Sequence, residues 1–130
     1  MKSLINNQEI QNIISISKDD ANIQFETKDI EEVFKSKSSF QIIVDEANSK
    51  NSMQICMDKI VQSIQSIKNI STLLIRFDMN PNHPAKELML SIQFLNNLLD
   101  KNSGIIFGTS TNEALSKQYI KISAIVIYGT

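Results

Sequence analysis

The sequence predicts an α/β (α+β) two-layer sandwich: a four-stranded mixed sheet in βαβαββ order with two helices on one face, preceded by an N-terminal helical segment. Two observations predict this class. From Phe40 onward, short apolar runs rich in β-branched residues alternate with stretches whose apolar residues recur at helical spacing. The last two apolar runs are separated only by a polar turn, so the order ends in two consecutive strands.

Residues 1–38 are predicted to be a helical lead-in to this sandwich. Isoleucines recur at helical spacing within residues 6–17, and this apolar stripe at the very start suggests the tail of a longer helix. A loop is expected from Ala21 to Glu26. Thr27 is then placed to cap a second helix, whose first turn is acidic, as the helix dipole favours.

Residues 39–130 are predicted to form the sandwich itself. The first strand and helix are expected at Phe40–Val44 and Ser52–Ile67, and the second strand at Thr72–Asp78. Pro84 is expected to open the second helix, because proline is tolerated at the first helical position. The residues expected to face inward from this second helix are Ala85, Leu88, Met89, Ile92, Leu95 and Leu99.

The final two strands are expected at Gly104–Ser110 and Tyr119–Tyr128. Along the last strand one face is apolar throughout, whereas the other is polar until Ile125 and Ile127. On the second strand, Arg76 and Asp78 alternate with apolar residues. They are therefore predicted to line the solvent face of the sheet.

Length, charge and cysteine content narrow the functional classes. The 130 residues fit one domain, and 13 basic against 14 acidic residues give a net charge of −1. This balance favours neither nucleic acid nor an anionic membrane as a partner. One cysteine, Cys56, excludes an internal disulfide and fits a cytoplasmic location; its helical position predicts a buried side chain rather than a nucleophile. No run reaches the roughly 20 apolar residues that span a membrane.

The sequence offers no self-contained catalytic or metal site. His83 is the one histidine, and no second ligand stands at helical or turn spacing from it. It is predicted to be a turn residue before the second helix. Met53 and Met57 lie on the apolar stripe of the first helix and are predicted to be core.

The C-terminal part of the chain resembles a known protein family. The strand Gly104–Ser110, which reads G-I-I-F-G-T-S, leads through a polar turn into the final strand Tyr119–Tyr128. This order resembles the end of the C-terminal domain of FtsZ, the bacterial tubulin-like cell-division GTPase. With the preceding elements included, the resemblance covers nearly the whole chain, and it implies a cytoskeletal protein that polymerises.

The resemblance also implies a site. The segment Gln24–Ile30 is similar to the family's co-catalytic loop, which reads N-x-D-F-x-D before an aliphatic residue and reaches the nucleotide of the next subunit. Glu26 and Asp29 keep two acids three residues apart, so they would be the catalytic pair when a GTP-bearing subunit lies against them. The residues expected at the interface are Gln24, Phe25, Glu26, Lys28 and Asp29. Read without the resemblance, the two acids are ordinary helix N-terminal residues.

Two departures from the family limit this expectation. Replacement of aspartate by Glu26 moves the carboxylate by about 1 Å, and a misplacement on that scale costs about 10²-fold in rate. The family's phosphate loop, G-G-G-T-G-S/T-G, has no counterpart among the three glycines of this sequence. The chain is therefore expected to bind no cofactor alone, and GTP only through a partner subunit or a nucleotide-binding domain.

Three functions are compatible with this pattern. The first is an FtsZ-like C-terminal domain that contacts FtsZ-type filament subunits or itself, as a filament-end modulator. The second is a fragment of a complete GTPase that supplies the co-catalytic loop to its neighbour. The third is a small oligomeric ligand-binding module of the chorismate-mutase-like fold, against which the single arginine, Arg76, argues because an anionic ligand would need more.

Overall fold

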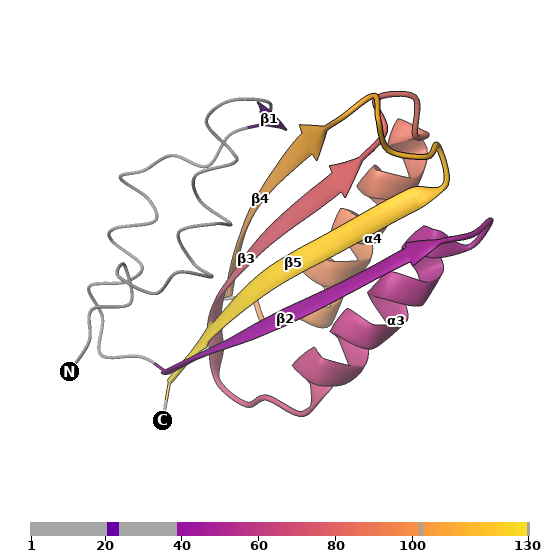
Figure 1. Ribbon diagram of the computed structural model, residues 1–130. Coiled ribbons are helices and arrows are strands. Elements are labelled where there is room, and N and C mark those ends of the chain that lie inside the picture. The colour runs from indigo at the N-terminus through magenta and orange to yellow at the C-terminus, as the bar shows by residue number, and fades with distance from the viewer. Residues whose placement is uncertain (1–20, 24–38, 102, 130) are drawn as a thin grey trace.

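The described residues form a five-stranded sheet with two helices. The structure is a computed structural model that describes residues 21–23, 39–101 and 103–129 (Figure 1). Its elements are β1 (Ala21–Ile23), β2 (Ser39–Asn48), α3 (Ser52–Gln65), β3 (Ile70–Met79), α4 (Ala85–Leu98), β4 (Gly104–Thr111) and β5 (Tyr119–Tyr128). From β2 onward this is the predicted βαβαββ order. The bounds of β5 agree with the prediction at both ends.

The sheet is mixed, with the strand order β1-β4-β3-β5-β2. β3 and β4 are parallel, whereas β5 lies antiparallel to β3 on one side and to β2 on the other. β2 and β3 therefore run in the same direction with β5 between them. Both α3 and α4 lie on the same face of the sheet (Figure 1), so the predicted two-layer arrangement is confirmed.

The strand β1 corrects the loop predicted from Ala21 to Glu26. Residues 21–23 instead pair antiparallel with the end of β4, with Ile23 opposite Thr109. Alanine and asparagine have little preference for strands. The strand forms because the edge of β4 offers unpaired backbone groups, and this signal is not local in the sequence.

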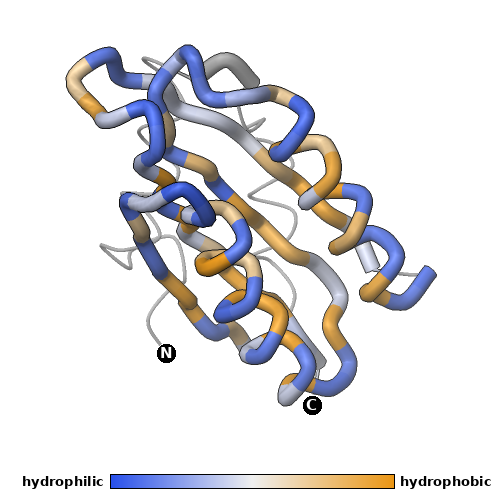
Figure 2. Tube along the Cα trace, turned by 90° about the vertical axis from the view of Figure 1, so that its right-hand side faces the viewer, coloured by the Kyte–Doolittle hydropathy of each residue, from blue (hydrophilic) through white to orange (hydrophobic). Residues whose placement is uncertain are grey.

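The core lies between the sheet and the helices. Alternate residues of β3 and β5 point toward the helix layer, and α3 contributes Cys56, Ile60 and Ile64 from one stripe. Apolar and polar residues alternate along both helices (Figure 2), as expected for helices that bury one face. The largest fully buried side chains include Phe77, Leu73, Ile75, Leu95, Ile120 and Ile122.

Burial extends to the face of the sheet that points away from the helices. Leu74 on β3 and Ile125 on β5 are directly paired, and both point away from the helix layer. Together with Ile127 they are almost completely buried. Ile125 and Ile127, the two apolar residues on the otherwise polar face of the last predicted strand, are therefore core residues.

The helix boundaries depart from the prediction by one or two residues. α3 ends at Gln65 rather than Ile67, and the following turn places Asn69 at φ 61°, a left-handed conformation that asparagine tolerates. Pro84 is the N-cap of α4 and not its first residue, since its ψ of 121° is extended. Met89, predicted to face inward, is 50% exposed, and Ala85 is exposed too. The stripe that α4 buries runs through Leu88, Ile92 and Leu95.

Candidate functional site

The residues predicted from the FtsZ resemblance lie outside the described part of the structure. They are Gln24, Phe25, Glu26, Lys28 and Asp29. Their role therefore stays a prediction. The described strand β1 ends one residue before Gln24, where Ile23 pairs with Thr109 of β4. The backbone immediately before Gln24 is thus attached to the edge of the sheet.

The turn before α4 is joined to the loop between β4 and β5. The side-chain amide of Asn80 donates to the carbonyl oxygen of Leu115 at 2.7 Å. The His83 ring places Nδ1 3.2 Å from the carbonyl oxygen of Lys117 and Nε2 2.6 Å from a Glu87 carboxylate oxygen. His83 thus lies in the turn before α4, as predicted, with Nδ1 near Lys117 and with Nε2 beside Glu87 but without a hydrogen-bond partner among the described residues.

On the face of the sheet that points away from the helices, polar side chains form pairs with one another. Arg76, predicted to be solvent-exposed, is only 6% exposed and forms an ion pair with Asp78. Arg76 lies opposite Ser123 on β5 and opposite Gly108 on β4. Because Gly108 has no side chain, it leaves room for the long side chain of Arg76. A buried, paired arginine is poorly placed to bind an anionic metabolite from solution.

A second polar pair joins the two antiparallel strands β5 and β2. The Tyr119 hydroxyl donates to a carboxylate oxygen of Glu46 at 2.7 Å. Burial raises the pKa of Tyr119 to about 12, and the bond to Glu46 acts in the same direction. Next to this pair, Lys121 lies opposite both Glu46 and Asp78 in the sheet register.

Cys56 is a core residue, as predicted. Its side chain is fully buried, with Sγ 3.8 Å from the carbonyl oxygen of Ile120. Burial raises the pKa of the thiol to about 11, with a further contribution from the nearby carboxylates of Asp45 and Glu46. Because the reactive form is the thiolate, these surroundings disfavour nucleophilic chemistry. Among the described residues, no three histidine, cysteine or acidic side chains are grouped closely enough to hold a metal ion.

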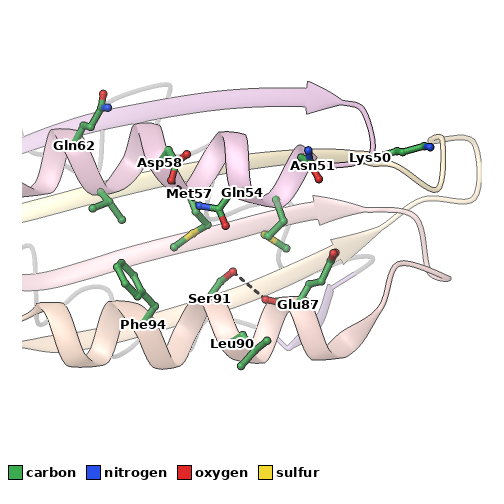
Figure 3. Close-up of a pocket in the computed structure, with 12 residues that line it drawn as sticks. Lys50, Asn51, Gln54, Met57, Asp58, Gln62, Glu87, Leu90, Ser91 and Phe94 are labelled. Atoms are coloured by element: carbon green, nitrogen blue, oxygen red, sulfur yellow. Dashed lines mark hydrogen bonds between the residues drawn. The ribbon is translucent and has the colours of Figure 1, made fainter.

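A groove of about 850 Å³ lies between α3 and α4 (Figure 3). Its apolar lining consists of Met53, Met57 and Val61 from α3 and Leu90 and Phe94 from α4. Sequence reasoning assigned the two methionines to the core, which is correct, because both are nearly buried. It did not assign Leu90 and Phe94, which are 54% and 53% exposed.

A row of polar side chains borders the groove along α3. Asn51, Gln54, Asp58 and Gln62 follow one another at about one helical turn, and the Gln54 amide donates to Asp58 at 2.7 Å. Lys50, just before α3, and Glu87, in the first turn of α4, lie near the end of the groove where both helices begin (Figure 3). The signal in the sequence was the pair Leu90 and Phe94, two large apolar residues four apart and off the buried stripe of α4.

These features define a two-layer α/β domain with a groove on its helix layer. Solved structures of FtsZ are similar to it in fold. An empty dimer of FtsZ from M. jannaschii superposes with a TM-score of 0.74 at 16% identity, over 92% of this chain and 35% of that one. A substituted variant of FtsZ from M. jannaschii gives 0.74 at 17% identity, over 93% and 37%.

These comparisons confirm the predicted fold, that of the FtsZ C-terminal domain. The chain spans little more than a third of the FtsZ chains that it matches. No protein-family model matches the chain, and no curated protein sequence matches it. No helix in the described residues is long and apolar enough to cross a membrane.

Proposed function

We propose that this chain acts by protein–protein contact in an FtsZ-type filament, where it occupies a filament end and limits growth. The observation that carries the proposal is the FtsZ fold over 92% of the chain. The segment Ile23–Ile30 is the docking edge, because it resembles the loop that contacts the subunit below in family filaments. The 130 residues contain no glycine-rich phosphate loop, so the chain would offer this contact without a nucleotide site to receive the next subunit.

The described residues support this proposal at one point. Pairing of β1 with β4 attaches the first residue of the docking segment, Ile23, to a strand of the folded domain. A docking loop whose entry is fixed loses less conformational entropy on binding than a free one. Glu26 and Asp29 would then approach the nucleotide-bearing face of the neighbouring subunit.

Sedimentation of an intact FtsZ from the same cell tests the proposal. With GTP present and this chain titrated in, we expect pelletable polymer and GTP turnover to fall as the ratio of chain to FtsZ rises. The variant Glu26→Ala with Asp29→Ala is expected to lose this effect. Asp58→Ala, which removes an exposed acid from α3, is the matched control and should retain it. Unchanged assembly at large excess of the chain would reject the filament-end role.

A second candidate is co-catalysis of GTP hydrolysis as part of a larger GTPase. The observation that favours it is the span of the chain, about a third of each FtsZ chain. Mixing the chain with an isolated FtsZ nucleotide-binding domain is then expected to raise GTP turnover, and Asp29→Ala should remove the increase. The two candidates predict opposite changes in turnover, since a filament-end modulator lowers it.

A further inference from the structure

The groove between α3 and α4 has features that folding alone does not require. Leu90 and Phe94 keep about half of their surface exposed, although they stand beside the buried Met53 and Met57. Exposed apolar side chains that gather around a concavity are typical of interaction sites. Methionine suits such a site because its flexible, polarisable side chain adapts to different partner shapes.

The spacing of the lining residues favours a helix as the occupant. Met53, Met57 and Val61 repeat every four residues along α3, and Leu90 and Phe94 do so along α4. The lining runs from Asn51 to Gln62 along α3 and from Glu87 to Phe94 along α4, so the groove is about 17 Å long on its α3 side. An amphipathic helix of about 12 residues matches that length and can place apolar residues at i, i+4, i+7 and i+11 against the floor.

The charge of the groove favours a basic occupant. Between the two ends of the groove, Asp58 is the one charged side chain among the described residues that line it. Its neighbours in the polar row, Gln54 and Gln62, are neutral. Lys50 and Glu87, of opposite charge, lie near the end where both helices begin, and the Glu87 carboxylate is 2.6 Å from His83 Nε2. A lysine or arginine at the middle of the bound helix would therefore meet a negative charge.

We propose that the groove between α3 and α4 binds a basic amphipathic helix of a partner protein, with Leu90 and Phe94 as the apolar contacts and Asp58 as the contact for the basic residue. This surface lies on the helix layer and is separate from the docking edge Ile23–Ile30. The proposal is thus independent of the filament role. It gives the domain a means to hold a second protein.

Fluorescence anisotropy of labelled 18-residue model peptides tests the proposal, with the full chain as receptor and no FtsZ present. One peptide carries leucines at i, i+4, i+7 and i+11 with lysines beside them; a second has glutamates in place of the lysines, and a third has the composition of the first in scrambled order. We expect the first peptide to bind more tightly than either of the others. Leu90→Ser with Phe94→Ser is expected to weaken this binding by about tenfold or more.

Two further variants make the test specific. Ile55→Ser with Met89→Ser removes two side chains that are 47% and 50% exposed on the same helices but do not line the groove, so binding should be retained. Asp58→Lys should reverse the preference between the basic and acidic peptides. Circular dichroism establishes that each variant is folded.

Three results would overturn the proposal. One is equal binding of the basic, acidic and scrambled peptides. Another is an equal loss of binding in the control pair and in the groove pair. The third is self-association of the chain in sedimentation equilibrium that only the Leu90 and Phe94 substitutions abolish, because a second copy would then be the occupant.

Discussion

Tyr119 is a residue whose ionisation the fold opposes. Its hydroxyl is partly buried and donates to Glu46, and its pKa is raised from 10.0 to about 12. In the unfolded chain the phenol returns to its ordinary pKa, so above about pH 10 the unfolded state loses its proton first. The contribution of Tyr119 to stability is complete below that pH and is lost as the pH rises toward 12.

We therefore expect the free energy of unfolding to fall between pH 10 and pH 12, and to fall less steeply in Tyr119→Phe. Urea denaturation at a series of pH values measures both slopes. At pH 8 the substitution should cost about 1 kcal/mol or less, since it removes one hydrogen bond to a charged but exposed partner. Tyr128→Phe is the control, because Tyr128 has no such bond to Glu46. Equal alkaline slopes for Tyr119→Phe and the unsubstituted protein would contradict the assignment.

Arg76 shows which properties of a single residue the sequence predicts and which it does not. Its alternation with apolar neighbours correctly placed it on the sheet face away from the helices. Its exposure could not be inferred, because burial there depends on neighbours such as Gly108 and Ser123 that come from other strands. The catalytic role predicted for Glu26 and Asp29 would likewise depend on a subunit outside this chain.

At the scale of elements, periodicity predicted α3 and β5 well because each has one wholly apolar face. Ile60 shows the energetic consequence. It is fully buried between α3 and the sheet, whereas Ile55 on the same helix is 47% exposed. On α4 the same reasoning placed Met89 inside, because Met89 is adjacent to Leu88 and a wider apolar stripe that includes it also fits the helical spacing. The groove was not predicted, because it combines residues from two helices that only the sheet brings together.

The contrast between these isoleucines gives a prediction with an internal control. Ile60→Ala should lower the free energy of unfolding by about 2 to 5 kcal/mol, because it removes buried methyl groups and leaves a cavity. Ile55→Ala should change it by about 0.5 kcal/mol or less. Chemical denaturation of both variants measures the difference. Similar losses for the two would show that the stripe assigned to the core of α3 is wrong.

At the scale of the whole molecule, the strand order determines which parts open first. β3 and β5 are hydrogen-bonded on both sides and carry most of the fully buried residues. Among the described strands, β2 pairs only with β5, so alternate amides of β2 lie on an edge. The short β1, which local propensity did not predict, exists only through the edge of β4.

Native-state hydrogen exchange followed by NMR should reproduce this order. Amides of β3 and β5 are expected to exchange only through global unfolding, so their opening free energy should equal the free energy of unfolding from denaturation. Ile60→Ala should then lower the opening free energy of these amides by the same amount as it lowers the free energy of unfolding measured in urea. The edge amides of β2 and those of β1 should exchange faster and be unaffected by Ile60→Ala, because their opening does not require the core to separate. Amides of β5 that open well below the global free energy would mean that the sheet comes apart in stages, with β2 and β5 leaving as a separate hairpin-like unit.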